Sequence, residues 1–266
     1  MVQDSEGGWF ADLALPDERA RAHWLLKLPR GKSDDDRAVL RNEAAYLRLA
    51  ARCGLRAPFG DKGIEDGVML VDEMLFVRRF DRLVQDGKLH RLHQESLASL
   101  AGLRGFGQPV TQNGLLKALR SHATDPLAET LEFIKRDVLN RSMRNTDNHA
   151  RNTAMQRTLD GLIQLTPVFD FAPMFKDPEV VPRSVHWTSA SGVHVHAWAE
   201  VLEVLASSAL VSAEEHAHVV DELVAFAQTV GSLPSIAHEV GVEPEILEQC
   251  RASIDAQARQ LATLKA

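Results

Sequence analysis

N-T-D-N-H-A-R-N at residues 145–152 and D-F-A at residues 170–172 are the two runs from which the architecture of this chain can be inferred. Two β-prone segments, residues 153–156 and 163–169, lie between them and flank Asp160-Gly161, a dipeptide that favours a hairpin turn. Such a hairpin returns the chain, so that the two runs face a single site.

Three polar residues of these runs, Asp147, Asn152 and Asp170, match what phosphoryl transfer from ATP requires. One carboxylate must orient the acceptor hydroxyl, and an Asn and an Asp must hold Mg²⁺ on the phosphates. Taken singly, each residue is more often a helix cap or a turn residue, and D-x-x-x-x-N is common by chance. The hairpin and the D-F-A that follows favour the phosphotransfer interpretation.

A lysine inside an apolar segment supports this prediction. Lys27 lies in W-L-L-K-L-P at residues 24–29, where an ammonium group costs free energy unless it has a partner. Glu43, on the helix that follows, is the candidate partner. A strand lysine paired with a helix glutamate is how kinase-like sites direct an ammonium group at the α- and β-phosphates.

Hydrophobic periodicity predicts two parts of different character. Strands are expected at residues 9–15, 23–28, 67–71 and 74–80, and a helix at residues 37–52. Helices are then expected at residues 96–103, 115–122 and 127–143, and in three patterns from about residue 195, after an irregular loop at 173–192. The predicted class is α+β, a two-lobed protein-kinase-like fold. Residues 1–82 form a small α/β nucleotide-binding N-lobe, and residues 83–266 form a larger, mostly helical C-lobe with the catalytic loop and the metal-binding aspartate.

Composition excludes several classes of protein. The chain is 45% hydrophobic and 25% charged, which is typical of a globular protein. At 266 residues it is too long for a small disulfide-stapled scaffold. Cys53 and Cys250 form no C-x-x-C pair, which favours a reducing cytoplasm. No apolar run is long enough to span a membrane, and residues 1–6 do not resemble a signal peptide. A formal charge of −7 argues against a surface that binds nucleic acid throughout, but allows a local basic patch.

The chain resembles the HipA-type serine/threonine kinases, the toxins of bacterial toxin–antitoxin systems. Six motifs in the order of that family carry the resemblance: residues 23–29, 42–58, R-F-D-R at 79–82, R-L-H-Q-E at 91–95, 145–152, and L-T-P-V-F-D at 165–170. The sequences of the last two motifs are most similar to those of a YjjJ-like branch of the family. One position departs from the family, because Ser96 stands where an aspartate is usual.

The resemblance implies roles for single residues. Asp147 would be the catalytic base, Asn152 and Asp170 would bind Mg²⁺, and Lys27 would bind the ATP phosphates with Glu43 as its partner. Gln94 and His149 would line the nucleotide site, and Phe80 and Asp81 would form the hinge under the adenine.

The implied function is ATP- and Mg²⁺-dependent phosphorylation of a protein Ser or Thr hydroxyl by a bacterial cytoplasmic kinase. The substrate class of the family is an aminoacyl-tRNA synthetase or another translation factor, and its partner is a small helix-turn-helix antitoxin. The alternative hypothesis is a catalytically silent or DNA-associated interaction module that retains the kinase-like fold.

The N-terminus departs from the family pattern. HipA-type kinases carry a phosphate loop with Gly and Ser ahead of the strands that precede the lysine, and no such loop is found before Lys27. Residues 2–5 match the end of the strand after that loop, and Gly7-Gly8 is interpreted as a turn. The N-lobe is therefore expected to be incomplete at its start. Either an upstream segment or a separate chain, docked on an exposed strand edge at Val2, completes it, or the kinase is degenerate; residues 1–266 alone are expected to transfer phosphate weakly.

Three further features are each consistent with a functional and a purely structural interpretation. Arg136, Arg141, Arg144 and Arg151 lie near the catalytic loop and could bind an acidic substrate or nucleic acid, or form a solvated face. The histidines at 186, 194 and 196 are more often structural than metal ligands in such a pattern. Residues 235–247 have helix-turn-helix spacing, but their acidic second half favours a helical hairpin that does not contact DNA.

Overall fold

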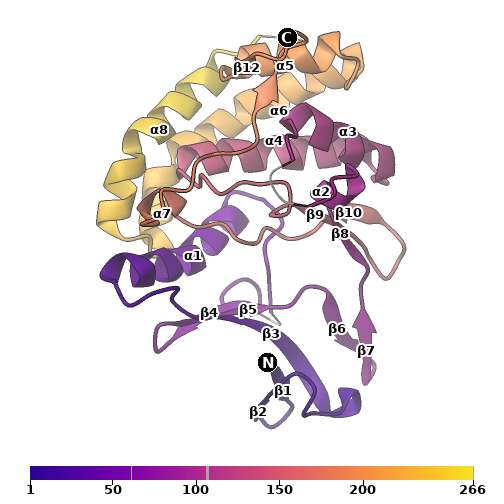
Figure 1. Cartoon of the computed structure of the whole chain (residues 1–266), viewed down its shortest axis with the longest axis vertical. Coiled ribbons are helices and arrows are strands. Elements are labelled where there is room, and N and C mark those ends of the chain that lie inside the picture. The colour runs from indigo at the N-terminus through magenta and orange to yellow at the C-terminus, as the bar shows by residue number, and fades with distance from the viewer. Residues whose placement is uncertain (61, 106–107, 266) are drawn as a thin grey trace.

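The structure is a computed structural model that describes residues 1–60, 62–105 and 108–265. Figure 1 shows a sheet-rich part that contains the N-terminus and a helical part that contains the C-terminus, with helix α1 (Asp34–Arg52) between them. The α+β class predicted from the sequence is confirmed.

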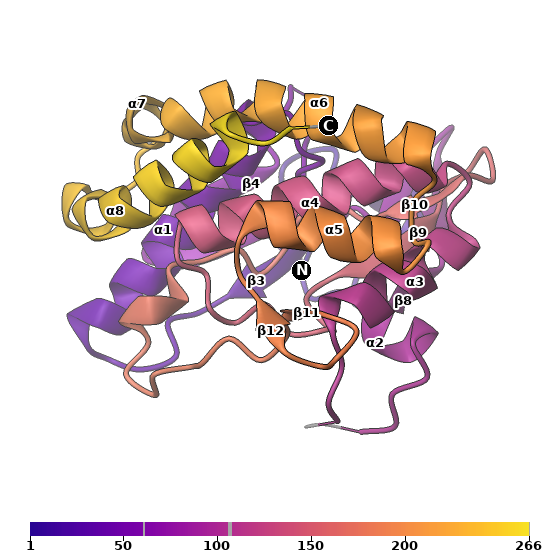
Figure 2. The same ribbon diagram turned by 90° about the horizontal axis from the view of Figure 1, so that it is seen from above.

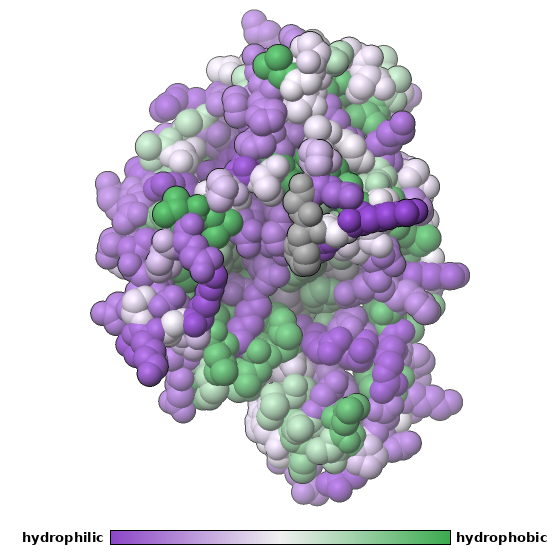
Figure 3. Space-filling model, in the orientation of Figure 1, coloured by the Kyte–Doolittle hydropathy of each residue, from purple (hydrophilic) through white to green (hydrophobic). Residues whose placement is uncertain are grey.

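Within the described residues, five strands form an antiparallel sheet in the order β2-β1-β3-β5-β4. Its strands are β1 (Val2–Asp4), β2 (Trp9–Phe10), β3 (Ala20–Lys27), β4 (Val68–Val71) and β5 (Met74–Arg78). Apolar side chains remain exposed on this sheet, among them Trp9, Leu25 and Val71. Figure 3 shows green, hydrophobic surface at the end of the molecule where the sheet lies.

The start of the sheet differs from expectation in two respects. A strand over residues 9–15 is predicted, but the structure has only Trp9–Phe10, because the chain turns at Ala14, whose N–H bonds the Ala11 carbonyl at 2.9 Å. The short β2 pairs with β1, Phe10 opposite Val2, and β3 pairs with the other side of β1. Val2 is therefore on an interior strand, and the exposed docking edge predicted there is wrong.

Helix α1 begins earlier than expected, at Asp34 instead of residue 37, because Ser33 caps it. The Ser33 side chain accepts from the Asp36 N–H, and the Asp36 carboxylate accepts from the Ser33 N–H, which forms a capping box. Asp34, Asp35 and Asp36 thus lie in the first turn, where their negative charges interact favourably with the positive end of the helix dipole. The helix ends before Gly54, whose φ of 79° suits glycine.

The strands expected at residues 67–71 and 74–80 pair within the sheet as the β4–β5 hairpin, whose turn residues Asp72 and Glu73 lie in the left-handed region, at φ 48° and 63°. A second hairpin, β6 (Arg82–Gln85) with β7 (Lys88–Arg91), is absent from the sequence prediction. Its Asp86-Gly87 turn, with φ of 52° and 70°, is the same kind of signal as Asp160-Gly161.

The helical part contains α2 (Leu97–Leu100), α3 (Gln112–His122), α4 (Pro126–Ser142), α5 (Trp198–Ser207), α6 (Ala213–Gly231), α7 (Leu233–Glu239) and α8 (Pro244–Ala262). Helix α4 runs through its middle with α5, α6 and α8 around it (Figure 2). In the described chain four helices follow residue 195 where three patterns are predicted, because the last one divides at Gly241, with φ 90°. Residues 235–247 thus form the expected helical hairpin.

Short strands complete the helical part. The predicted hairpin around Asp160-Gly161 is β9 (Ala154–Arg157) with β10 (Ile163–Leu165), and β8 (Gln94–Ser96) adds a strand to it that was not predicted. The loop expected at residues 173–192 contains a short 3-10 turn (Met174–Lys176) and β11 (Trp187–Thr188), which pairs with β12 (His194–Val195). Trp187 fills the core there, which gives the segment its fixed place.

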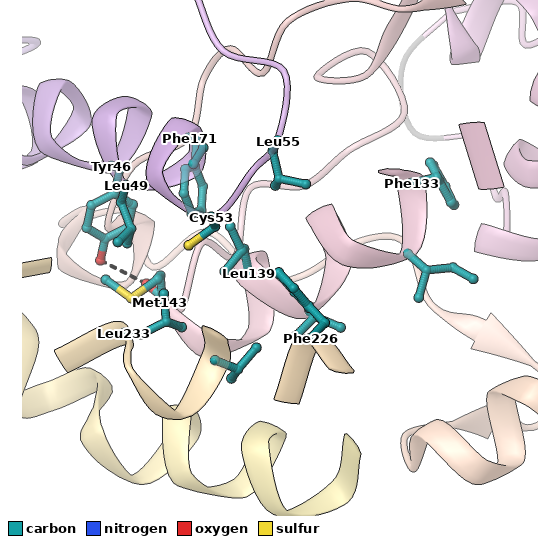
Figure 4. Packing of buried hydrophobic residues seen from close by; sticks show 14 of the residues in the cluster. Tyr46, Leu49, Cys53, Leu55, Phe133, Leu139, Met143, Phe171, Phe226 and Leu233 are labelled. Carbon is teal, nitrogen blue, oxygen red and sulfur yellow. Dashed lines mark hydrogen bonds between the residues drawn. The ribbon is translucent and has the colours of Figure 1, made fainter. Parts of the chain in front are cut away.

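A continuous core joins α1 to the end of α4, next to the loop at 145–152. Figure 4 shows Tyr46 of α1 pointing at Met143, whose carbonyl accepts the Tyr46 hydroxyl at 2.9 Å. The ring of Phe171 packs on Tyr46 at 4.9 Å between centroids and is 3% exposed. Helix α1, the end of α4 and the D-F-A segment are thereby held as one unit.

Candidate active site

The last residue of β3 and the middle of α1 meet at the predicted lysine–glutamate pair. Antiparallel pairing places Lys27 opposite Leu75, so its side chain leaves the sheet on the side of α1. The Lys27 Nζ lies 2.6 Å from Glu43 Oε1 and also donates to Asp170 Oδ1. The sheet, the helix and the D-F-A segment therefore converge on one ammonium group.

Burial and pairing act in opposite directions on these groups. Burial lowers the pKa of Lys27, but the carboxylates of Glu43 and Asp170 outweigh it, and the pKa lies above its ordinary value. Glu43, with a side chain only 6% exposed, has a raised pKa because burial outweighs the attraction of Lys27. Lys27 is consequently protonated at neutral pH, with two acidic partners to direct it.

Asp170 occupies an uncommon backbone conformation. Its φ of 50° lies in the left-handed region, where a residue other than glycine needs support from its surroundings. Asn145 supplies it, since its Nδ2 donates to the Asp170 carbonyl at 3.3 Å and to Asn140 Oδ1 at 2.9 Å. The buried Phe171 anchors the next residue, so the Asp170 carboxylate points away from the core, with 40% of its side chain exposed.

The loop at 145–152 folds back on itself around Asp147. The Asn152 side-chain amide donates to the Asp147 carbonyl at 2.8 Å, and the Asn152 N–H donates to the His149 carbonyl at 2.9 Å. His149 Nε2 lies 3.8 Å from Asp147 Oδ1. Burial raises the pKa of Asp147; His149 opposes this, and the nearby Asp170 adds to it. A carboxylate with a raised pKa is a better proton acceptor than an exposed one.

Asn152 and Asp170 line one small cavity of about 30 Å³, together with Asn145 and Asn148. The Asn152 Nδ2 donates to the Asp147 carbonyl within the loop. Its Oδ1 accepts no hydrogen bond from the described residues. Mg²⁺ prefers oxygen ligands, keeps several waters and is usually held by one or two carboxylates together with phosphates. The donor set fits that ion, although no cluster of three His, Cys, Asp or Glu side chains occurs in the described ranges.

A buried aspartate that the sequence analysis missed anchors this loop. Asp137 of α4, with a side chain 2% exposed, accepts from Arg141 Nε at 3.1 Å, from Trp187 Nε1 at 2.9 Å, from Asn148 Nδ2 at 3.3 Å and from Arg183. These charged and polar donors hold its pKa low although burial alone would raise it. The spacing of four residues from Arg141 was the only signal in the sequence, and it is also the spacing of an ordinary surface pair.

The hinge residues lie apart from this cluster. Phe80 packs near Phe169, with 6.2 Å between ring centroids, and lines a groove of about 930 Å³. The Asp81 carboxylate accepts hydrogen bonds from Arg79 at 2.6 Å and from Arg82 at 2.7 Å. Burial raises the pKa of Asp81, but the two arginines outweigh it, and the pKa is lowered. Gln94 is an exposed residue of β8 opposite Gln156. None of the three contacts Lys27 through a hydrogen bond in the described chain.

Further features noted in the sequence lie outside the cluster around Lys27. His186 and His194 stack at 4.2 Å, and His196 lies edge-on to both, with no carboxylate or thiol completing a metal site among the described residues. Cys53 and Cys250 are buried free thiols. No helix within the described ranges is long and apolar enough to cross a membrane.

Comparisons with known proteins bear on the family and the fold of the chain. A family model described as "HipA-like C-terminal domain" matches residues 4–231. The "Putative kinase Y4mE" of Sinorhizobium fredii is 26% identical over 179 residues, which are 65% of this chain and 40% of that protein. The chain thus spans less than half the length of this curated relative.

Two solved structures share the fold. HipA in the Shewanella oneidensis complex of HipA, HipB and operator DNA superimposes with a TM-score of 0.63 and 17% identity, over 93% of this chain and 63% of that chain. The Helicobacter pylori proinflammatory kinase CtkA gives a TM-score of 0.56 and 13% identity, over 90% and 89%. The fold is therefore kinase-like, as predicted.

Proposed function

The chain belongs to the family of HipA-like C-terminal domains, and we propose that it is a kinase that transfers the γ-phosphate of ATP to a Ser or Thr hydroxyl of a protein, with Mg²⁺ as cofactor. One observation carries the proposal: Lys27, Glu43 and Asp170 meet beside Asp147 and Asn152. A lysine–glutamate pair, a base and an Asn–Asp metal pair are the recurring parts of a kinase site.

In the proposed reaction the acceptor oxygen forms a bond to the γ-phosphorus while the bond from that phosphorus to the β–γ bridging oxygen breaks, leaving ADP. Asp147 orients the hydroxyl and accepts its proton at a carboxylate oxygen. Lys27, fixed by Glu43, directs its ammonium group at the phosphate oxygens. Asn152 and Asp170 would hold Mg²⁺, which when bound neutralises charge on the phosphates.

The proposal divides the chain into a nucleotide-binding N-lobe at residues 1–82 and a C-lobe at residues 83–266. It places the adenine at the hinge of Phe80 and Asp81, with Gln94 and His149 near the nucleotide. Since Arg79 and Arg82 occupy the Asp81 carboxylate, the backbone of the hinge is the part able to bond the adenine.

The partners are proposals drawn from the family. The Shewanella HipA structure contains HipB and operator DNA. By analogy, a small DNA-binding antitoxin is proposed as a partner of this chain. A translation factor such as an aminoacyl-tRNA synthetase is proposed as its substrate.

Nucleotide titration tests the proposal. We expect ATP to bind more tightly with Mg²⁺ than with EDTA in isothermal calorimetry, and Asp170→Asn to remove the difference. The matched control is Asp255→Asn, which changes an exposed carboxylate of α8 and should leave the difference intact. Equal affinity with and without Mg²⁺ in the unaltered chain would contradict the proposal.

A second measurement separates a kinase from a silent interaction module with the same fold. Asp147→Asn should retain ATP affinity and lose phosphotransfer by about 10²–10⁴-fold, because the base acts on the acceptor and not on ATP binding. ATP binding without phosphotransfer in the unaltered chain, on a panel of Ser and Thr proteins, would favour the silent module.

A further inference from the structure

A second pocket, not used by the proposed phosphotransfer, lies where the catalytic loop meets the segment that follows Asp170. Its volume is about 320 Å³. The residues that line it are three arginines, Arg141, Arg144 and Arg183, together with two histidines, a threonine of the catalytic loop, and four amide side chains from α4, that loop and α8. No acidic residue of the described ranges lines it. Two of these arginines were noted in the sequence, and the fold brings the third to them.

Each guanidinium group is held in place and still has donors to offer. Arg141 donates from Nε to Asp137 and from Nη1 to the His196 carbonyl. Arg183 donates from Nε to the Val185 carbonyl and from Nη2 to Asp137. Arg144 donates from Nη1 alone, to the Gln249 carbonyl at 3.2 Å. Each of the three arginines also has other N–H groups that bond no acceptor within the described chain.

Two of the arginines stack on aromatic rings. The Arg141 guanidinium lies 4.3 Å from the Trp198 ring centroid, and that of Arg144 lies 4.2 Å from the Phe175 centroid. A stacked guanidinium loses little further conformational freedom when it binds a ligand. The pocket is therefore preorganised.

The charge and shape of the pocket select an anion. Arg141 and Arg183 share one buried carboxylate, Asp137, and Arg144 bonds only a carbonyl within the described residues, so positive charge remains in excess. Planar guanidinium forks match carboxylate and phosphate groups, to which they donate pairs of hydrogen bonds. A nucleic acid needs a basic stripe that follows many phosphates, whereas this chain has a formal charge of −7 and gathers these three arginines around one pocket of about 320 Å³.

We propose that this pocket binds a carboxylate or phosphate group on the protein substrate, close in sequence to the acceptor hydroxyl. This inference rests on the proposed function. Arg144 precedes Asp147 by three residues, so their Cα atoms are at most about 11 Å apart. An extended peptide advances about 3.3 Å per residue. The acidic residue is therefore expected within about four positions of the Ser or Thr that receives the phosphate.

Arg144 provides the cleanest test, because it does not contact Asp137 and its loss leaves the anchor of the catalytic loop intact. The probes are labelled peptides with one acceptor Ser in a neutral background and a single Glu at each position from four before to four after it. A parallel set carries phosphothreonine instead of Glu, which distinguishes carboxylate from phosphate recognition. Binding is measured by fluorescence anisotropy without ATP, and phosphorylation by mass spectrometry with ATP.

We expect the best acidic peptide to bind the unaltered chain at least about tenfold more tightly than the neutral peptide. Arg144→Gln should remove this preference and Arg144→Lys should retain part of it. The matched control is Arg251→Gln, an exposed arginine of α8, which should change nothing. Arg144→Glu should prefer a peptide with Lys at the same position, an outcome that mere loss of folding cannot produce.

The outcomes separate this inference from the proposed function. Phosphorylation without acidic preference would overturn the pocket and leave the kinase in place. Acidic binding that depends on Arg144, without phosphorylation of any peptide, would support the pocket and contradict the kinase. Displacement of the peptide by a single-stranded oligonucleotide that binds more tightly through Arg144 would overturn the assignment to a protein substrate.

Discussion

Replacing Asp137 with asparagine tests whether one buried carboxylate holds the catalytic loop in place. The substitution keeps the size of the side chain and removes its charge. Arg141 and Arg183 then lose their shared counter-charge in a site where Asp137 is 2% exposed, and the bonds from Trp187 and Asn148 weaken. The attachment of the loop at 145–152 through Asn148 becomes weaker.

The expected loss in the free energy of unfolding follows from the burial of the Asp137 carboxylate. Breaking a buried ion pair by removing one partner costs about 3–5 kcal/mol, since the other charge stays behind without compensation. Arg141 and Arg183 are 14% and 18% exposed, so water recovers part of their solvation, and the lower end of about 3 kcal/mol is expected. A domain with about 5–15 kcal/mol of stability should still fold. Phosphotransfer should fall as well, because Asn148 no longer fixes the loop.

Equilibrium unfolding in urea at several pH values measures this. The folded pKa of Asp137 is below its ordinary value of 3.8, because the paired donors outweigh burial. Its contribution to the free energy of unfolding is therefore fully present above the unfolded pKa and is lost as the pH falls through the folded pKa. The difference between the unaltered chain and the variant should be constant near pH 7 and shrink below about pH 4.

Asp17→Asn is the matched control, because Asp17 pairs with Arg91 at 2.8 Å but is 44% exposed. An exposed pair contributes about 0–1 kcal/mol. Equal effects of the two substitutions, or a loss below about 1 kcal/mol for Asp137→Asn, would refute the argument that burial makes this carboxylate an anchor.

Three further results are expected. Glu43→Gln should raise the KM for ATP about tenfold, because Lys27 loses a charged partner; steady-state kinetics that show an unchanged KM would contradict the role of the pair. Tyr46→Phe should lower the free energy of unfolding by about 1–2 kcal/mol, since the Met143 carbonyl loses a buried donor; urea unfolding measures it, and no change would mean that the carbonyl finds another donor. The acid limb of the kcat/KM profile should reflect Asp147, whose burial raises its pKa; activity should be lost as the pH falls through a value above 3.8, and full activity at pH 4 would argue against Asp147 as the base.

Local signals in the sequence were sufficient for the elements that carry the chemistry. The D-F-A segment, the Asp160-Gly161 turn and the apolar strand around Lys27 each act over a few residues, where turn preference and periodicity decide the backbone. The pairing of Lys27 with Glu43 also followed, because a buried ammonium group needs an acidic partner.

Long-range contacts were outside the reach of the same reasoning. Arg183 meets Asp137 across 46 residues, and Asn145 meets the Asp170 carbonyl across 25. Nothing in their local sequence distinguishes these side chains from ordinary surface residues or turn residues. The strand order also depends on partners far away, and for that reason the edge at Val2 was misplaced.

Asp137 links the two sites that the structure suggests. Its Oδ1 accepts from Asn148 of the catalytic loop and from Arg183 of the basic pocket, and its Oδ2 accepts from Arg141 of that pocket. An anion that drew either arginine toward itself would weaken that arginine's bond to Asp137, and the carboxylate would then attract the Asn148 amide more strongly. Occupation of the pocket is therefore expected to tighten the loop that holds Asp147, so that an acidic substrate peptide would raise kcat as well as lower KM. A neutral peptide of equal length would lack the first effect, whereas a pocket that only adds binding energy would change KM alone.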